Sequence, residues 1–257
     1  MTTSEGWHGW DTYAAFYDWE NARTLGRRDV AFWRRTLRAE QARTLELGCG
    51  TGRLLVPMAR TGVPMVGIDR SSEMLARAAA RIRRLPRDQR PRLIRGDIRT
   101  LPFPDRAFGV VMAPYGLLQS LLRESDLSAL LDDVHRVLRP GGLFGIDLVP
   151  DLPAWREYNE KVSMRGVGPR GGELTLVETV RQDRRRKLTI FDETFVERIG
   201  RRQAKHSFSL TFRTLSLPEV VDRIGAAGFE VEQLLGDYRG GRWTDESSEW
   251  LIVARRR

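Results

Sequence analysis

One segment, LELGCGTG at residues 45–52, constrains the fold of this 257-residue chain more than any other. It joins a short apolar run, residues 42–47, to a helical pattern over residues 53–61. Glycines at such a junction allow a tight turn between a strand and a helix, and they let a ligand approach the backbone closely. The segment therefore predicts a strand, a turn and a helix arranged around a ligand site.

An acidic residue follows the turn at the distance expected of a nucleoside site. Asp69 ends the second predicted strand, residues 63–69. Nucleoside-binding βαβ units carry a carboxylate about 20 residues after the first glycine of the turn, where it accepts hydrogen bonds from ribose hydroxyls. Counted from Gly48, Asp69 matches that spacing. We therefore expect the turn and Asp69 to bind one nucleoside ligand.

Glu46, just before the first glycine, distinguishes this turn from a dinucleotide site. A carboxylate there would repel a pyrophosphate and attract an amine or a sulfonium. The Lys-Ser/Thr ending of a phosphate-binding loop is absent from the segment, which argues against hydrolysis of ATP or GTP. The pattern favours a nucleoside that carries a cationic group.

Strand and helix patterns alternate from the first strand as far as Pro150, which predicts a parallel, doubly wound α/β sheet. Residues 7–40 have an aromatic-rich helical pattern before the first strand. The further predicted strands are residues 91–95, 107–112 and 143–149, and the further helices are residues 71–84 and 126–138. Ser71 or Ser72 is expected to cap the first of these two helices.

The alternation of strand and helix patterns ends after Pro150. Three runs rich in Thr, Val, Phe and Leu predict an antiparallel three-stranded meander at residues 173–181, 187–198 and 201–213. A helix at residues 218–227 and two strands at residues 229–235 and 249–254 then close the sheet. We therefore interpret the meander as an insertion into the sheet domain.

Composition excludes several classes of protein. The chain is 41% hydrophobic and 30% charged, as is ordinary for a globular protein, and no apolar run approaches the roughly 20 residues that cross a bilayer. The first residues lack the pattern of a secretory signal, so we expect a cytoplasmic protein. A single cysteine, Cys49, excludes an internal disulfide and a Cys-based zinc site, and no metal is expected.

Four motifs in this order resemble the class I S-adenosylmethionine-dependent methyltransferases: LELGCGTG, GIDRSSEML, GDIRTLPF and LRPGGLFGIDL, within residues 42–149. The resemblance implies an α/β, Rossmann-like, doubly wound sheet of seven strands in the order 3-2-1-4-5-7-6, with the last strand antiparallel. In this chain the antiparallel three-stranded insertion would follow the fifth strand. The implied cofactor is S-adenosylmethionine, which becomes S-adenosylhomocysteine.

The resemblance also implies cofactor positions. The glycine turn and Glu46 would frame the methionine part, Asp69 would hold the ribose, and Asp97 with the Ile98 backbone would contact the adenine edge. The backbone at Ala113 and Pro114 would face the methionine amine. The full set of implied positions is Tyr13, Tyr17, Glu46, Gly48, Cys49, Gly50, Asp69, Arg70, Met74, Asp97, Ile98, Ala113 and Pro114. For Cys49 itself, a role as a small packing residue is the favoured interpretation.

The aromatic N-terminal helix with Tyr17-Asp18, the insertion and the GDYRGG segment resemble a bacterial small-molecule group that includes aminosugar N-methyltransferases. That resemblance implies an N-terminal helical lid at residues 1–40. The methyltransferase domain would comprise residues 41–150 and 215–257. The insertion, residues 151–214, would contribute to the acceptor pocket or to a dimer contact, and we expect a monomer or a homodimer.

Methyl transfer from a sulfonium is an in-line displacement, so the enzyme must mainly align the nucleophile and exclude water. A general base is required only if the nucleophile carries a proton. The candidate catalytic residues are Tyr17, Tyr115 and His206, and the further candidate bases are Tyr13, Gln119 and Asp147. His206 alternates with Phe208 and Leu210 on its predicted strand, so a packing role stays open for it.

The segment Ala113-Pro114-Tyr115-Gly116 argues against exocyclic base amines and side-chain amides as acceptors, because Ala113 cannot accept a hydrogen bond from an amine. We predict a small-molecule acceptor with a nitrogen or oxygen nucleophile, and no membrane partner. Two alternatives stay open. One is an RNA or protein methyltransferase that uses the arginine runs near residues 77–95, 181–187 and 255–257. The other is a protein that binds S-adenosylmethionine without transferring its methyl group.

Overall fold

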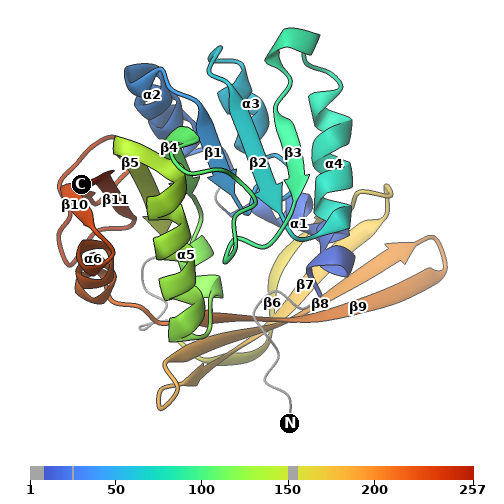
Figure 1. The fold of residues 1–257 in the computed structure, drawn as a ribbon. Coiled ribbons are helices and arrows are strands. Elements are labelled where there is room, and N and C mark those ends of the chain that lie inside the picture. The colour runs from blue at the N-terminus through green and yellow to red at the C-terminus, as the bar shows by residue number, and fades with distance from the viewer. Residues whose placement is uncertain (1–8, 25, 150–155) are drawn as a thin grey trace. The chain divides into compact units, whose positions relative to one another are not determined.

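The computed structural model describes residues 9–24, 26–149 and 156–257, and the chain divides into two compact units (Figure 1). The larger unit contains Arg27–Pro150 and Ser216–Arg257. The smaller unit contains Met1–Gly26 and Asp151–Leu215. Each unit is therefore built from two separate stretches of the sequence.

A seven-stranded sheet forms the centre of the larger unit, with the strand order β10-β11-β5-β4-β1-β2-β3. β11 is antiparallel to β5 and β10, and the remaining neighbours are parallel. Counted within this sheet alone, the order is 3-2-1-4-5-7-6, so the predicted topology is confirmed. The strands are β1 (Thr44–Leu47), β2 (Met65–Asp69), β3 (Arg92–Arg95), β4 (Phe108–Ala113), β5 (Leu138–Leu148), β10 (Phe229–Leu235) and β11 (Trp250–Arg256).

Helices cover both faces of this sheet. Gly145 of β5 lies against the Trp33 ring, and a Cβ added there would come within 2.7 Å of that ring. The preceding residue, Phe144, points to the other face and contacts Phe229. The helical segments are α2 (Val30–Glu40), α3 (Leu55–Ala59), α4 (Ser72–Ile82), η1 (Arg87–Gln89), η2 (Leu117–Ser120), α5 (Glu124–Val137) and α6 (Leu217–Ala226).

The cap of α4 was predicted from its sequence and is confirmed at Ser71, whose hydroxyl accepts a hydrogen bond from the Met74 amide at 3.1 Å. The junction of α5 and β5 differs from the prediction. The helix ends at Val137, and β5 begins at Leu138, so the Pro-Gly-Gly segment lies within the strand. A register shift against β4 absorbs the irregular residues, because Phe108 pairs with Leu138 and Val110 with Leu143.

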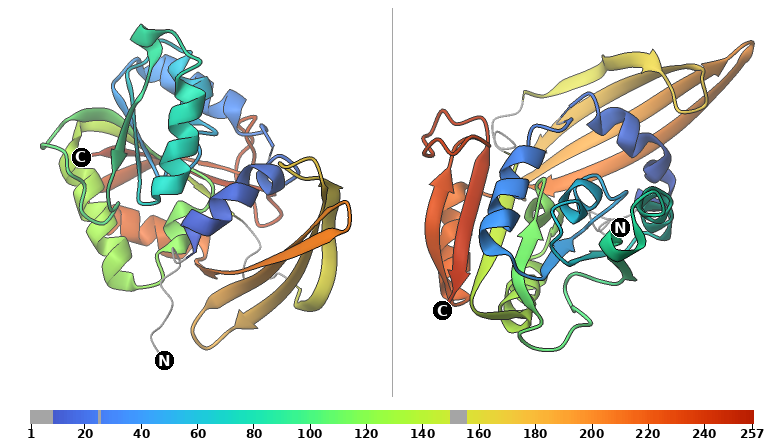
Figure 2. Two further views of the ribbon diagram at one scale, coloured as in Figure 1. Left: turned by 90° about the vertical axis from the view of Figure 1, so that its right-hand side faces the viewer. Right: turned by 90° about the horizontal axis from the view of Figure 1, so that it is seen from above.

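The smaller unit is an antiparallel sheet in the order β6-β7-β8-β9, with α1 (Trp10–Asn21) packed on it (Figure 2). Its strands are β6 (Tyr158–Val167), β7 (Glu173–Asp183), β8 (Leu188–Ile199) and β9 (Arg202–Arg213). Phe16 of α1 stacks on Phe195 with ring centroids 4.5 Å apart, and the Trp19 indole donates to the Val167 carbonyl at 2.8 Å. Aromatic side chains thus join the N-terminal helix to the insertion.

The prediction of three strands in the insertion was wrong by one, because β6 was missed. β6 lies at the edge of the sheet, and most of its side chains are exposed. The segment YNEKVSMRGV has no strict alternation of apolar and polar residues, since an edge strand packs little of its surface. Its pairing with β7 is a tertiary contact that the local pattern does not encode.

A helical pattern was predicted over residues 7–40, and the described part of this range contains two helices. α1 belongs to the smaller unit, and α2 belongs to the larger one. Across residues 9–24, 26–149 and 156–257, no helix is long and apolar enough to span a membrane.

Candidate functional site

The glycine turn after β1 requires glycine for two reasons. Gly48 and Gly50 have φ values of 58° and 51°, in the left-handed region that side chains rarely adopt. A Cβ on Gly48 would lie 2.6 Å from Cδ1 of Leu117 in η2. The turn lies at the carboxyl ends of β1 and β4, the edge where parallel α/β sheets bind ligands.

The Asp69 carboxylate stabilises this turn through hydrogen bonds. Its Oδ2 accepts a hydrogen bond from the Gly50 amide at 2.7 Å, and its Oδ1 accepts one from the Ser71 amide at 2.9 Å. The parallel pairing of β1 with β2 brings the turn and Asp69 to one edge of the sheet. The structure thus brings together the two features that the sequence predicted to act on one ligand.

Glu46 is a buried carboxyl group with an unused oxygen. The residue is 3% exposed, and its Oε2 has no hydrogen-bond partner. Burial raises the pKa of Glu46 to about 8, although the charge of Arg53 acts in the opposite direction. A buried acceptor without a donor is costly, so a cationic or N–H-bearing ligand group would stabilise it.

Arg53 and Asp29 form a buried ion pair beside Glu46 that the sequence did not indicate. Both guanidinium Nη atoms donate to the Asp29 carboxylate at 2.7 Å, and Asp29 is fully buried. The Arg53 guanidinium also lies over the Tyr115 ring, 5.7 Å from its centroid. Because the first strand of the sheet separates the two partners in the sequence, no local pattern reveals the pair.

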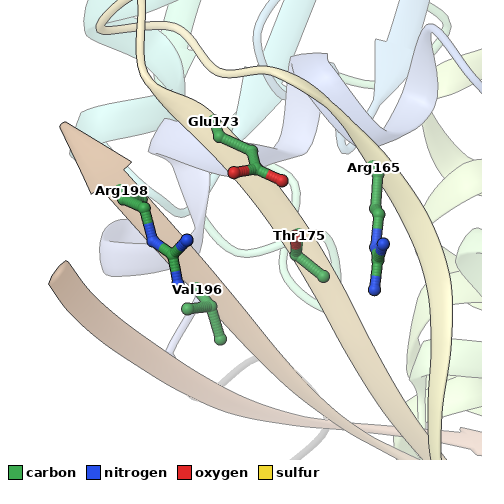
Figure 3. Close-up of a pocket in the computed structure, with 5 residues that line it drawn as sticks. All are labelled: Arg165, Glu173, Thr175, Val196 and Arg198. Atoms are coloured by element: carbon green, nitrogen blue, oxygen red, sulfur yellow. The ribbon is translucent and has the colours of Figure 1, made fainter. Parts of the chain in front are cut away.

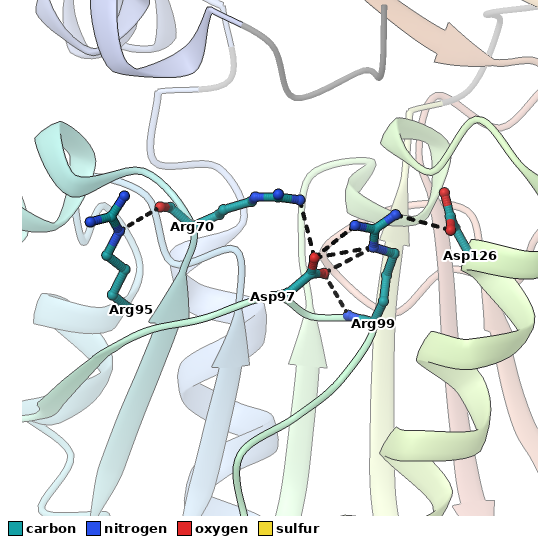
Figure 4. A network of polar contacts seen from close by, with 5 residues as sticks. All are labelled: Arg70, Arg95, Asp97, Arg99 and Asp126. Carbon is teal, nitrogen blue, oxygen red and sulfur yellow. Dashed lines mark hydrogen bonds and ion pairs between the residues drawn. The ribbon is translucent and has the colours of Figure 1, made fainter. Parts of the chain in front are cut away.

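A second polar network surrounds Asp97 after β3 (Figure 4). Arg99 donates to Asp97 through Nη2 at 2.8 Å and through its own backbone amide at 3.0 Å, and its Nη1 reaches Asp126 at 3.0 Å. Arg70 adds a further contact to Asp97 at 3.1 Å. The hydrogen bonds from Arg99 lower the pKa of Asp97 below its usual range. Asp97 is therefore ionised and already shared between two arginines.

The turn after β4 is held by residues from distant parts of the chain. Tyr115 and Gly116 both have positive φ, and the Gly116 amide donates to the Asp147 carbonyl at 2.8 Å. The Asp147 carboxyl accepts a hydrogen bond from the Tyr238 hydroxyl at 2.7 Å, and burial raises the pKa of Asp147 to about 7. Tyr238 belongs to the GDYRGG segment, whose sequence did not predict this contact.

Gln119, a candidate base, has a structural role instead. Its amide nitrogen donates to the Val149 carbonyl at 3.0 Å, and its amide oxygen accepts from the Val149 amide at 2.9 Å. Both ends of the side chain are therefore used. Nearby, Ala113 and Pro114 are buried at the end of β4.

Some of the remaining predicted positions are buried in the larger unit, and others lie in the smaller unit. Met74 and Cys49 are buried, and burial with Glu46 and Asp69 nearby raises the pKa of the Cys49 thiol. Ile98 is half-buried beside Asp97. Tyr13, Tyr17 and His206 belong to the smaller unit. The ring centroids of Tyr13 and Tyr17 are 6.0 Å apart, and those of His206 and Phe16 are 5.0 Å apart.

A hollow of about 250 Å³ lies on the smaller unit's sheet, on the face opposite to α1 (Figure 3). Thr175 and Val196, which pair across β7 and β8, alternate with the buried residues of those strands. None of the site residues predicted from the sequence lines this hollow. Its lining is Arg165, Glu173, Thr175, Val196 and Arg198.

Known proteins resemble the chain in sequence and in fold. Residues 44–142 match a model of a methyltransferase domain. The cypemycin N-terminal methyltransferase of a Streptomyces species is 30% identical over 212 residues, which is 82% of each chain. The CcbJ methyltransferase from Streptomyces caelestis has 20% identity, a TM-score of 0.79 and 96% coverage of each chain.

A structure of CalS10 with bound S-adenosylmethionine, described as an amino pentose methyltransferase from Micromonospora echinaspora, is also similar. It has 24% identity and a TM-score of 0.70, with 94% of this chain and 96% of that chain covered. Similarity over most of both chains, on a sheet of this strand order, makes the chain a member of the class I S-adenosylmethionine-dependent methyltransferases.

Proposed function

We propose that this methyltransferase transfers the methyl group of S-adenosylmethionine to a nitrogen or oxygen nucleophile of a small molecule by in-line displacement. The observation that carries the proposal is Glu46, whose buried Oε2 lacks a donor beside a glycine turn braced by Asp69. A nucleoside with a cationic amino acid group supplies both matching parts: an ammonium for Glu46 and ribose hydroxyls for Asp69.

The residues present fit the cofactor. When bound, S-adenosylmethionine supplies an activated sulfonium methyl group. Glu46 would accept hydrogen bonds from its ammonium, and the turn at Gly48 and Gly50 would admit its methionine part. Asp97 would share its carboxylate between the adenine edge and the arginines that already contact it. The chain's own task is to align the acceptor and exclude water.

Tyr17, Tyr115 and His206 stay our candidates for contacts with the reacting groups. The lid role of residues 1–40 and the acceptor or dimer role of residues 151–214 also stay predictions. Among these candidates, Tyr115 is the residue that the site geometry favours, because it follows β4 at the ligand-binding edge and packs under Arg53.

Contacts within the chain favour a small acceptor over a nucleic acid. Many arginines in the basic runs already donate to protein acceptors: Arg81 to Thr51, Arg90 to Leu85 and Arg181 to Asp192. Arginines engaged in this way are less available to neutralise phosphates. Methylation of RNA or protein through these arginine runs would therefore require the arginines to leave their present hydrogen-bond acceptors.

A labelled-methyl assay tests the proposal. Purified protein and methyl-labelled S-adenosylmethionine would be incubated with a fractionated extract of the source cells, and label would be counted in the small-molecule, RNA and protein fractions. We expect label in the small-molecule fraction. Label confined to macromolecules would support the arginine-run alternative, and cofactor binding without any label would support a binding protein without transfer.

Asp69→Asn is expected to weaken S-adenosylmethionine binding about 10- to 100-fold, because charge-assisted hydrogen bonds of roughly 1.5–3 kcal/mol would be lost. Isothermal titration calorimetry measures the change. Asp105→Asn, a change at an exposed carboxylate paired with Arg136, is the matched control. An unchanged dissociation constant for Asp69→Asn would remove Asp69 from the cofactor site.

Gly48→Ala is expected to destabilise the protein by about 1–3 kcal/mol, because the positive φ is strained for alanine and the new methyl group would meet Leu117. Urea denaturation measures this change. Gly62→Ala is the control, since Gly62 also has positive φ but a Cβ there would meet nothing within 4 Å. Equal losses in the two variants would mean that the Leu117 contact is unimportant.

A further inference from the structure

Two carboxylates face each other across neighbouring strands of the smaller unit. Glu178 of β7 and Glu193 of β8 are directly paired in the antiparallel register. Their alternate neighbours, Leu176 and Val180 on β7 and Phe195 on β8, are buried, so both carboxylates point to the face that packs against α1. Like charges placed directly opposite each other destabilise a sheet.

A third carboxyl group from α1 joins this pair. Glu20 interacts electrostatically with both Glu178 and Glu193. Burial and the charge of Glu178 raise the pKa of Glu20 to about 7, and burial with both neighbours raises the pKa of Glu193. We call these three residues the glutamate cluster. Its members come from three elements, α1, β7 and β8, so a sequence pattern does not indicate it.

The cluster has fewer donors than its acceptors require. The Tyr13 hydroxyl donates to Glu20, and the Tyr158 hydroxyl donates to Glu178. Glu193 is 3% exposed, and its Oε2 has no partner. Within the described ranges, none of the three carboxyl groups forms a salt bridge. One candidate cation, Lys161, pairs with Glu178 in register, but its ammonium lies over the Tyr158 ring, 5.0 Å from the ring centroid.

Aromatic rings surround the cluster. Phe208 of β9 pairs with Glu193 in register, and its ring lies 5.4 Å from that of Tyr13. His206, two residues before Phe208 on β9, has a buried Nε2 without a partner. Carboxylates beside aromatic rings are the groups that bind organic ammonium ions, through charge-assisted hydrogen bonds and cation–π contacts. Glu20 and Glu178 are half-buried, whereas Glu193 is buried.

We infer that the glutamate cluster, Glu20, Glu178 and Glu193, binds the cationic amine of a small organic molecule. An ammonium group supplies a donor for Glu193 Oε2 and a positive charge that would stabilise the ionised form of the cluster, which burial disfavours. The cluster costs stability when empty, and proteins retain such conflicts mainly at functional sites. The inference does not depend on the proposed function, because it concerns residues of the smaller unit alone.

Binding of simple amines tests the inference without methyl transfer. Trimethylammonium and methylammonium would be titrated into the full-length protein and followed by calorimetry and by NMR of the histidine imidazoles, with tert-butanol as the uncharged probe. We expect saturable binding of the ammonium probes at one site and none of tert-butanol. Glu193→Gln should weaken that binding at least 10-fold. Absence of saturable ammonium binding by the wild-type protein would overturn the inference.

Glu173→Gln is the matched control, because Glu173 lies on the same strand as Glu178 but lines the hollow on the opposite face. It should leave ammonium binding unchanged, and an equal loss in both variants would also overturn the inference. Glutamine is neutral and close in size to the buried Glu193 side chain, so Glu193→Gln should fold and melt at least as high as the wild type. S-adenosylmethionine binding measured on the same samples separates the two ideas: cofactor binding and methyl transfer with no amine binding refutes the cluster alone.

Discussion

Arg53→Met is expected to lower the free energy of unfolding by about 3–5 kcal/mol, because it leaves the Asp29 carboxylate buried without its partner. Asp29 is fully buried, and the Arg53 side chain is 14% exposed. Two hydrogen bonds at 2.7 Å hold the pair in a bidentate geometry. Urea denaturation of the purified variant measures the loss.

Two controls isolate the buried charge. The double variant Asp29→Leu/Arg53→Met should recover most of the stability, since no uncompensated charge stays buried. Arg181→Met breaks a pair with Asp192 that is half exposed on both sides, and it should cost less than about 1 kcal/mol. If Arg53→Met were as mild as Arg181→Met, the pair would not support the larger unit.

Glu46→Gln is expected to make the ligand-free enzyme more stable at pH 7, by up to about 3 kcal/mol. Burial raises the pKa of Glu46 from 4.5 to about 8, so the folded state holds the proton more tightly than the unfolded state does. The wild-type protein therefore loses stability as the pH rises from about 4.5 through about 8. The glutamine variant lacks this loss, and the two proteins should converge below pH 4.5.

The same change should weaken S-adenosylmethionine binding at least 10-fold, because a neutral amide cannot replace a carboxylate opposite an ammonium. Thermal unfolding across pH 4–9 and calorimetric titration measure the two effects. A stabilised variant with weaker cofactor binding is the expected outcome. If Glu46→Gln bound the cofactor as the wild type does, the role proposed for Glu46 would be wrong.

The sheet of the larger unit could be predicted because its signals are local. The glycine turn, the apolar strands and the serine cap of α4 each occupy a few neighbouring residues. Parallel pairing then places Asp69 beside the turn without further information. β6 could not be predicted, since its stability depends on pairing with β7 and its own residues are mostly exposed.

The partners of the site residues could not be predicted from the sequence either. Tyr238 lies close to the end of the chain, far from Asp147 in the sequence, and Glu193 is separated from Glu20 by most of the larger unit. Their contacts therefore exist only once the chain has folded. The sequence did contain one usable signal for Arg99: it follows Asp97 closely enough for a local hydrogen bond from its amide. Residue types predicted which groups would bind the cofactor, but tertiary structure decided which partners those groups have.

The order of the strands bears on how the protein is made. β5 pairs with β11 on one side, where Leu148 lies opposite Trp250, much later in the chain. A ribosome adding about 5–20 residues per second needs roughly 5–20 s to synthesise the roughly 100 residues between them. During that interval β5 is an apolar edge strand, which is a template for wrong pairing. Nascent chains stalled after β5 and before β11 should therefore be the stage at which this methyltransferase most needs a chaperone.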